Sequence, residues 1–574
     1  MKKFQVIFAI VLVFSFLSYG YSGVDVKKLD LKGFIESQAA KGVKKIIIPK
    51  GVYELPLIDS VPITLKNIKN VEIIGNGSEV ICKTYSQILQ LTNCENVKIS
   101  GLSFDFDPLP FSQGKIIDID KGKRMWWIVE LFKGYTQKQL MCDRIQIFDP
   151  HTLNLKKNGF TYWENEFEKI EKIGDRKIKI YKSRYSPKDF EELNDLVVLT
   201  AGTMHSAHDI YSIVIKKSKN ITLSEVTVYS STCFSFFEEE CENNHYFKCR
   251  VTKKLNDPKL SFPRLRSGYA DAFHSKSAYK GPTVEQCEFR YMGDDGIAIN
   301  SRFYLVNSGS NNQVDLVVGS PKTMIEEGNM VRFVSFQGVI KKDAKIIKIE
   351  QVSNSKPEEV AKIVQMYNLR SPRGLRVVLK LTLDRPVEVE AGDLVSSLSK
   401  SGSGFIVRNN IVGFTRARGI LIKASNGVIS GNSVEGCELG GIIVAPELYW
   451  MEAGFSENLK IWNNKIKDCL FTVSNPGNSQ ASALSIVAEN GEKKLAPAGA
   501  FKNISVLNNK IQGCPWPAVF IASLENGELK NNTITKSTTI IREHGKALGL
   551  SNQKPIWTDN IKNVTISNNK ILGQ

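Results

Sequence analysis

A short pattern of asparagine and alternating apolar residues recurs along most of the chain. Each copy runs from Asn through apolar residues at every second position to Asn-Asn, Gly-Asn or a similar polar pair, and the shortest intervals between copies are 23 to 26 residues. Apolar alternation is typical of a strand with one buried face, and a regular return of one pattern is typical of a solenoid. The copies begin at Asn70, Asn96, Asn220, Asn426, Asn458, Asn503, Asn526 and Asn563. The pattern therefore predicts an all-β chain, folded as a right-handed parallel β-helix.

Asparagine suits the corners between the strands of such a coil. It tolerates left-handed backbone, and its amide can bond to its copy on the next coil. We therefore expect ladders of asparagine along the solenoid. At the N-terminal end, the helical apolar pattern of residues 31–41 predicts a short helix that covers the open end of the first coil.

Two long stretches lack the repeat and divide the solenoid. Residues 109–205 and 303–400 contain strand-like apolar runs without the asparagine pattern, and we interpret both as small antiparallel β modules inserted between coils. The solenoid then comprises a first part with its cap (23–108), central coils (206–302) and C-terminal coils (401–574). Because the second module directly follows the central coils, we expect it to overhang any cleft there.

The first 22 residues have the three parts of an export signal. Lys2 and Lys3 precede the apolar run Phe4–Leu17, and the small residues Gly20 and Ser22 permit cleavage after residue 22. The run is short for a membrane span. We predict export to the periplasm or the outside, with no stable membrane insertion after cleavage; an uncleaved anchor is the alternative.

The ten cysteines and the formal charge of +17 each allow two interpretations. Cysteines of an exported chain can form disulfides, but inward positions of the repeat favour thiols as small apolar fillers. The cysteines at such positions are Cys249, Cys287, Cys437, Cys469 and Cys514. The positive charge suggests a polyanion partner, yet the lysines are scattered and no nucleic-acid motif is present. We expect no nucleic-acid partner, and lysines that keep strand edges from associating.

Three aspartates fall in two segments near the middle of the chain. Asp271 precedes Phe-His-Ser, and Asp294 and Asp295 follow 23 residues later between two glycines. This spacing is close to one coil, and neighbouring coils stack about 4.8 Å apart, so the carboxylates should lie side by side. The glycines permit the turn that two adjacent acids need to face one site. Closely placed carboxylates differ in pKa, so one can act as a general acid and another as a base in glycoside hydrolysis. The alternative is that Asp-Asp-Gly is a solvated turn.

The segments around Asp271 and Gly293–Ser301 resemble glycoside hydrolase family 110, exo-acting α-1,3-galactosidases that include enzymes cleaving the blood group B antigen. The resemblance covers most of the mature chain, and it implies a β-helix with two inserted small antiparallel β-barrel modules. It implies a homodimer and an inverting mechanism that needs no metal or other cofactor. It also implies that Asp294 is the general acid, and that Asp271 and Asp295 activate water on the opposite face of the sugar. The expected partner is a glycan with terminal α-1,3-linked galactose, linear or branched.

A second resemblance, to the polygalacturonases, departs at three places. That family shares the fold and an Asp-Asp-Cys-Ile-Ala-Ile stretch, but its Asn-Thr-Asp reads Tyr269-Ala270-Asp271 here and no His-Gly follows the double aspartate. Its Arg-Ile-Lys, which holds a uronate carboxylate, appears as Leu421-Ile422-Lys423. The lost arginine favours a neutral sugar. A pectic glycosidase is thus the first alternative, followed by a β-helix polysaccharide lyase and a non-catalytic glycan-binding protein.

Seven further residues are candidates for substrate binding, because the wall that carries the aspartates should continue past them. Charged donors there would bind sugar hydroxyls or tune a carboxylate; for each, a surface or packing role is the alternative. The candidates are His274, Lys276, Arg302, Arg418, Lys423, Glu447 and Trp450, the last beside Tyr449. The residues His205, His208 and Asp209 resemble a metal cluster only loosely, and we expect no metal site.

Overall fold

The computed structural model describes most of the chain. The described residues are 29–55, 62–135, 142–157, 159, 161–183, 191–200, 210–367, 375–471, 480–539 and 554–573. The predicted export signal lies outside these ranges, as do His205, His208 and Asp209.

Parallel sheets form the body of the protein, which confirms the predicted parallel β-helix. One sheet has 22 strands. They are β1 (Lys45–Ile47), β2 (Val52–Leu55), β4 (Lys69–Cys82), β6 (Glu95–Phe106), β15 (Thr222–Ser224), β16 (Thr227–Val228), β18 (His245–Phe247), β19 (Arg250–Val251), β21 (Thr283–Glu285), β22 (Glu288–Arg290), β29 (Ile406–Arg408), β30 (Ile411–Gly413), β32 (Val428–Ser430), β33 (Ser433–Glu435), β36 (Glu457–Trp462), β37 (Lys465–Lys467), β39 (Phe501–Leu507), β40 (Lys510–Gln512), β42 (Leu524–Lys530), β43 (Thr533–Thr535), β45 (Lys562–Ser567) and β46 (Lys570–Leu572).

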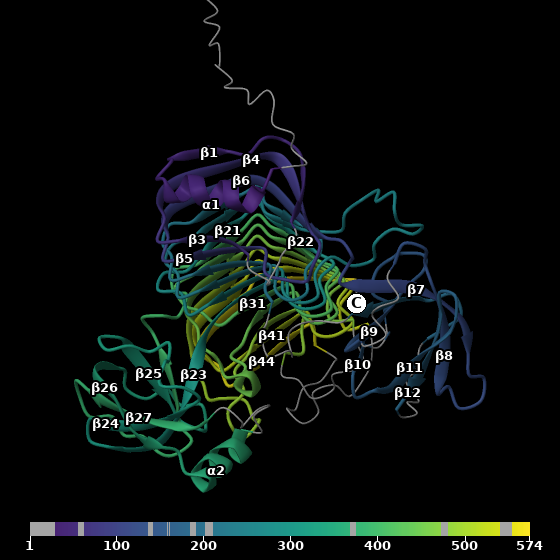
Figure 1. Ribbon diagram of the computed structural model, residues 1–574. Coiled ribbons are helices and arrows are strands. Elements are labelled where there is room, and N and C mark those ends of the chain that lie inside the picture. The colour runs from purple at the N-terminus through teal and green to yellow at the C-terminus, as the bar shows by residue number, and fades with distance from the viewer. Residues whose placement is uncertain are drawn as a thin grey trace, which may run out of the picture.

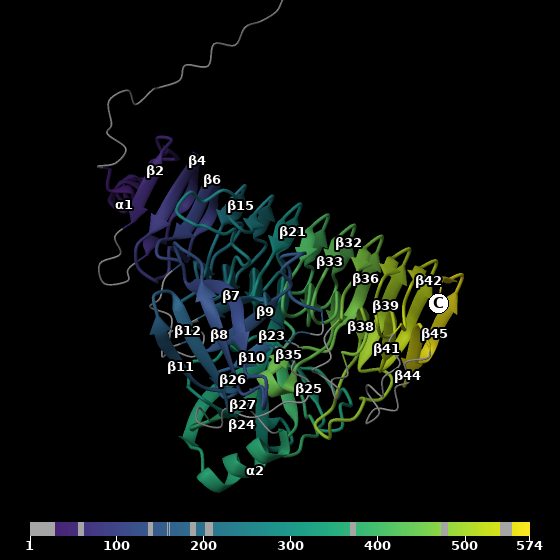
Figure 2. The ribbon, with the colours of Figure 1, turned by 90° about the vertical axis from the view of Figure 1, so that its right-hand side faces the viewer.

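The second parallel sheet takes one strand from each coil and carries the site described below. Its strands are β3 (Ile63–Lys66), β5 (Leu89–Thr92), β14 (Ile213–Lys216), β17 (Phe236–Glu239), β20 (Phe273–Lys276), the first part of β23 (Ile297–Ser310), β31 (Ile420–Ile422), β34 (Ile442–Val444), β38 (Leu484–Ile486), β41 (Val519–Ala522) and β44 (Ile556–Asp559). Pairing skips both insertions, since β5 pairs with β14 and β21 with β29. Figure 2 shows the coils stacked from the N-terminal end, with α1, to the C-terminal end.

Two ladders of asparagine join successive coils, as the repeat predicts. In the buried ladder each Nδ2 donates to the Oδ1 of the next coil over 2.9–3.0 Å, through Asn410, Asn432, Asn464, Asn509 and Asn532. An exposed ladder has left-handed backbone at its corners and includes Asn70, Asn96, Asn220 and Asn243. Leaving one buried amide unpaired costs about 1–3 kcal/mol, so the buried ladder fixes the register of the coils. All ten cysteines are buried thiols, as expected of apolar fillers.

A short helix covers the N-terminal end of the solenoid, as predicted. Helix α1 (Leu31–Ala40) begins where the Asp30 side chain accepts a hydrogen bond from the Gly33 N–H. It packs on β1, β2 and β3 through Leu31, Ile35 and Ala39, which are buried in the solenoid core. In the described part of the chain, no helix is long and apolar enough to cross a membrane.

The two inserted modules are antiparallel but differ in closure. The first has the strand order β10-β9-β13-β7-β8-β12-β11. No ladder joins its edge strands in the described ranges, so this module is an open sheet there rather than the expected barrel. Its strands are β7 (Phe111–Ile119), β8 (Trp126–Leu131), β9 (Arg144–Phe148), β10 (Thr161–Trp163), β11 (Phe167–Gly174), β12 (Lys177–Lys182) and β13 (Leu196–Thr200).

The second module closes into a barrel in the order β23-β24-β27-β26-β25-β28 and back to β23. Its further elements are β24 (Gln313–Val318), β25 (Met330–Val334), β26 (Ala344–Asn354), α2 (Pro357–Tyr367), β27 (Val377–Leu383) and β28 (Leu394–Ser397). Strand β23 runs without interruption from the solenoid into this barrel. Figure 1 shows the two modules leaving the solenoid on separate sides.

Candidate active site

The three aspartates meet at one place on the solenoid wall. Asp271 precedes β20 and Asp295 precedes β23; these strands pair in parallel, with Phe273 opposite Ile297. The Asp295 N–H donates to the Oδ1 of Asp271 over 3.1 Å. Each of the three carboxylates offers an oxygen within 4.8 Å of the others. The expectation that one coil of spacing places them side by side is correct.

His274 and Asn300 lie behind Asp271 and orient it. His274 Nδ1 is 2.8 Å from Asp271 Oδ2, and Asn300 Nδ2 is 2.9 Å from His274 Nε2. With the Asn300 amide oriented as it is here, Nε2 accepts, so the ring proton sits on Nδ1 and is donated to Asp271. Burial lowers the pKa of His274 to about 4, which keeps the ring neutral. The ring also stacks on Phe234.

Burial makes Asp271 and Asp295 hold protons more strongly than ordinary carboxyls. It raises the pKa of Asp271 well above its usual range, and the nearby Asp294 adds to this effect. It raises the pKa of Asp295 to about 7, against the opposing charge of Arg418. Arg418 donates its backbone N–H to Asp295 Oδ1 over 2.8 Å, and its Nη1 lies 3.4 Å from both carboxylate oxygens. The cluster therefore retains a proton near neutral pH.

Asp294 is the most accessible of the three acids. Its side chain is 19% exposed, against 6% for Asp271 and 7% for Asp295. Arg416 Nη2 donates to Asp294 Oδ1 over 2.5 Å, and Arg416 Nε donates to the Gly293 carbonyl over 2.8 Å. One arginine thus fixes both the backbone and the carboxylate of this turn.

A residue of the first module holds both acidic segments. Arg144 on β9 donates to the carbonyls of Gly293 and Tyr269, the second over 3.2 Å. These carbonyls directly precede Asp294 in one segment and lie two residues before Asp271 in the other. The Arg144 guanidinium also lies 4.0 Å from the Tyr269 ring centroid. The first module therefore positions the acids.

Buried ion pairs support the site on the side of Asp295. Arg418 pairs with Glu447, and Lys423 bonds Glu447 over 2.9 Å and Glu452 over 2.5 Å. Burial alone would raise the pKa of Glu447, but Arg418 and Lys423 outweigh it and lower this pKa to about 2. Lys423 has no exposed side-chain surface. These charges are neutralised among themselves before a sugar arrives.

A cleft of about 660 Å³ contains the three acids. The first module contributes Asp143, Arg144, Trp163, Glu164 and Asn165 to its lining. Among described residues, none from 303–400 lines it, so the expectation that the second module overhangs the cleft is wrong. Strand β23 leads from the solenoid wall into that module, whereas Arg144 of the first module contacts both acidic segments.

The structure separates the seven candidate binding residues into two groups. His274, Arg418, Glu447 and Trp450 line the cleft, whereas Lys276, Arg302 and Lys423 do not. Sequence reasoning missed Arg144, Trp163, Arg416 and Glu452, which also line it. Sequence reasoning could have found Arg416, because it lies two residues before Arg418 on a coil that was already a candidate. Arg144 and Trp163 carry no repeat signal.

Comparison with curated proteins links most of the chain to three similarly named relatives. It is 25% identical to alpha-1,3-galactosidase B of Bacteroides thetaiotaomicron, over 92% of this chain and 83% of that protein. It is 22% identical to alpha-1,3-galactosidase B of Akkermansia muciniphila, over 94% and 67%. It is 22% identical to alpha-1,3-galactosidase B of Phocaeicola vulgatus, over 88% and 84%.

No family model matches the chain. Among solved structures, the Erwinia carotovora polygalacturonase has a TM-score of 0.36 at 11% identity, covering 96% of this chain and 95% of that one. The Azotobacter vinelandii mannuronan C-5 epimerase A-module has a TM-score of 0.38 at 9% identity, covering 93% of each. The curated relatives support a glycoside hydrolase, built here on a parallel β-helix.

Proposed function

We propose that the protein is an exported exo-α-galactosidase that removes terminal α-1,3-linked galactose from glycans such as the blood group B antigen. The observation that carries this proposal is the cluster of three carboxylates within 4.8 Å, in a cleft with a different set of partners around each acid. The names of the relatives supply the sugar and the linkage.

The proposed reaction is a single displacement by water. Asp294, the most accessible acid, gives a proton to the glycosidic oxygen as the bond from that oxygen to the anomeric carbon breaks. Asp271 and Asp295 take a proton from the water whose oxygen attacks the same carbon from the opposite face. The Asp294 ion pair with Arg416 opens when the sugar enters, and Asp294 then receives the proton retained by the cluster.

The carboxylate spacing is short for an inverting enzyme. The nearest oxygens lie within 4.8 Å, whereas inverting enzymes usually separate their two carboxyls by about 6.5–9.5 Å and retaining enzymes by about 5–5.5 Å. The hydrogen-bond partners of the two proposed bases favour single displacement instead. Asp271 is held by His274, and Asp295 by Arg418, so each is oriented for accepting a proton rather than free to attack the sugar.

The charge of the cleft favours a neutral sugar over galacturonate. Seven carboxylates and three arginines line it: Asp143, Glu164, Asp271, Asp294, Asp295, Glu447 and Glu452, with Arg144, Arg416 and Arg418. Lys423, which matches the lysine of the polygalacturonase motif, is already bonded to Glu447 and Glu452. A uronate would add a further negative charge to an acidic site.

Leaving groups of different acidity test the role of Asp294. In Asp294→Asn, hydrolysis of α-1,3-galactobiose should fall at least about 1,000-fold, while dinitrophenyl α-galactoside, whose leaving group needs no proton, should lose far less. Asp271→Asn and Asp295→Asn should lose activity equally on both substrates. Asp384→Asn, at an exposed turn of the second module, is the matched control. Equal losses on both substrates in Asp294→Asn would remove it as the acid.

A further inference from the structure

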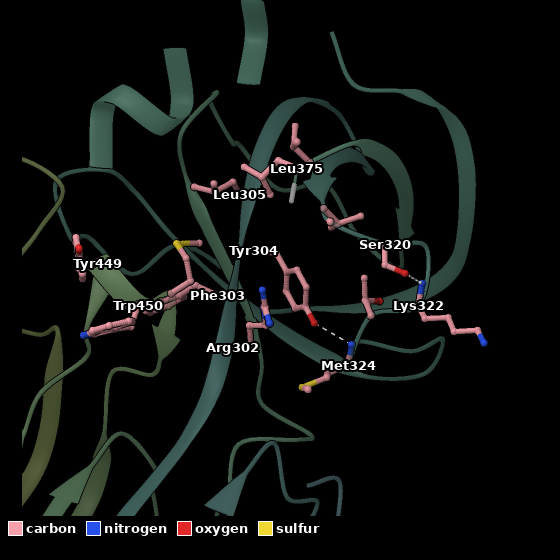
Figure 3. A pocket seen from close by; sticks show the side chains of 15 residues that line it. Arg302, Phe303, Tyr304, Leu305, Ser320, Lys322, Met324, Leu375, Tyr449 and Trp450 are labelled. Carbon is pink, nitrogen blue, oxygen red and sulfur yellow. Dashed lines mark hydrogen bonds between the residues drawn. The ribbon is translucent and has the colours of Figure 1, made fainter. Parts of the chain in front are cut away.

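A second pocket of about 430 Å³ lies between the second module and the cleft. Residues 302–305 of β23 form one side, residues 317–324 a second, and the turn that includes Tyr449, Trp450 and Met451 a third. In Figure 3, Arg302 and Tyr304 lie next to each other on β23, and Trp450 lies on the neighbouring turn. Its volume is within the range of small-ligand sites.

The pocket and the cleft share two aromatic residues. Tyr449 and Trp450 line both spaces. Their rings stand edge to face at 5.1 Å, and the residues are 46% and 47% exposed. The backbone of Arg302 pairs with Glu452, which lines the cleft. One β-ladder therefore separates the two spaces, and exposed amphipathic rings bridge them.

The charge of the pocket is opposite to that of the cleft. Its described lining contains Arg302 and Lys322 but no carboxylate. Arg302 is exposed, and within the described ranges its side chain makes no ion pair or hydrogen bond. The Tyr304 hydroxyl accepts a hydrogen bond from the Met324 N–H over 2.8 Å, which leaves its own proton to be donated. A guanidinium, a hydroxyl donor and partly exposed aromatic side chains suit a sugar with an anionic group.

We propose that this pocket is a second glycan subsite, which takes a saccharide unit bearing a sulfate or a carboxylate while the galactose occupies the cleft. The subsite rests on the proposed function, because only a bound galactoside places a neighbouring sugar at the Tyr449 and Trp450 rim. Arg302 binds the anionic group, and Trp450 packs against the ring of the sugar. The preferred substrate is therefore an acidic glycan with a neutral terminal galactose.

The test compares three disaccharides with purified full-length protein. One is neutral α-1,3-galactobiose, one carries a 6-sulfate on its reducing galactose, and one has galacturonate in the reducing position. We expect kcat/KM at low ionic strength to be about tenfold higher for at least one charged disaccharide, mainly through a lower KM. A preference for the sulfated or for the carboxylated disaccharide shows which of the two anionic groups the pocket binds.

Two variants assign the preference to this pocket. In Arg302→Ala the ratio of charged to neutral kcat/KM should fall to near one, and Arg302→Lys should restore part of it. Lys342→Ala removes one positive charge from an exposed position of the same module, outside the pocket lining, and should keep the ratio. Thermal unfolding checks that each variant is folded.

The outcomes separate the subsite from the proposed function. An unchanged ratio in Arg302→Ala, or no preference for either charged substrate in the unmodified protein, would overturn the subsite while hydrolysis of the neutral disaccharide upheld the galactosidase. Failure to hydrolyse any of the three would overturn the subsite, and failure on the branched blood group B trisaccharide as well would overturn the proposed function.

Discussion

The cleft and the neighbouring pocket share Tyr449 and Trp450, but their charged side chains differ in sign and in whether they are paired within the protein. In the cleft, buried acids are paired with arginines, a lysine and a histidine, because an unpaired buried charge is costly. In the pocket, Arg302 stays in contact with solvent and needs no internal partner. The cleft is thus organised before substrate binds, whereas the pocket presents charge for the substrate to complete. Changes in the cleft should alter turnover, and changes in the pocket should alter selectivity.

The largest effect is expected from the buried acids. Asp271→Asn and Asp295→Asn should each fold normally and lower kcat about 1,000- to 10,000-fold, because the proposed mechanism needs both carboxylates to hold and deprotonate the one attacking water. Steady-state hydrolysis of α-1,3-galactobiose measures the loss. Near-normal turnover in either variant would remove that residue from the proposed mechanism and weaken the contrast with the pocket.

His274 should have a smaller effect, through Asp271. His274→Ala removes the Nδ1–H that orients Asp271, and we expect kcat to fall about 10- to 100-fold with little change in KM. His274→Gln can still donate to Asp271 and should recover part of the rate. A rise in KM with unchanged kcat would show instead that His274 contacts the sugar. His245→Ala, at a half-buried position outside the cleft lining, is the matched control.

The pH profile tests the pairing of Arg418 with Asp295. A base must be ionised, and the pKa of Asp295 is raised to about 7, so kcat/KM should fall as the pH drops below 7. Arg418 lowers this pKa, so Arg418→Gln should move the acidic limb upward by about one pH unit. Arg408→Gln, which breaks an exposed ion pair with Glu285, should leave the limb in place. An unmoved limb in Arg418→Gln would assign it to another group.

Added salt should have a smaller effect, and it should act on the pocket more than on the cleft. The contribution of the exposed Arg302 is screened by ions, because the Debye length falls from about 30 Å at 0.01 M to about 3 Å at 1 M. The preference for a charged disaccharide should therefore decline several-fold across this range. Turnover of the neutral disaccharide should change by less than about twofold. Equal salt dependence of both substrates would contradict the assignment of charge recognition to the pocket.

A chelator should have the smallest effect. The three carboxylates have the geometry to surround a cation, but Arg416 and Arg418 already supply positive charge to Asp294 and Asp295. Activity after treatment with EDTA should stay within about twofold. A loss restored by one divalent metal would mean that the acids act as metal ligands.

The solenoid and its acids were predictable because their signals repeat locally. The asparagine pattern marks each coil, and one coil of spacing places Asp271 beside Asp295. Arg144 could not be found this way, because its contact with Gly293 spans 149 residues and belongs to a module without the repeat. Sequence order also placed the wrong module over the cleft, since the direction of β23 and the Arg144 contacts decide which one covers it.

Candidate binding residues were less predictable than the acids. Spacing on the wall found Arg418 and Glu447, but it could not show that these two residues neutralise each other. Lys423 sits on the same coil yet is buried beneath two glutamates. Periodicity gives the position of a side chain along the solenoid, whereas its availability depends on loops such as the one that carries Glu447 and Glu452.

The most direct test of the central claim is the anomer that forms first. A proton NMR time course on the branched blood group B trisaccharide, with the purified protein, follows the released galactose before it mutarotates. Initial β-galactose is the predicted result, because in the proposed mechanism Asp271 and Asp295 activate water opposite the bond that Asp294 protonates. Initial α-galactose would mean double displacement, as the short spacing of the carboxylates alone would suggest, and would contradict the roles given to all three acids.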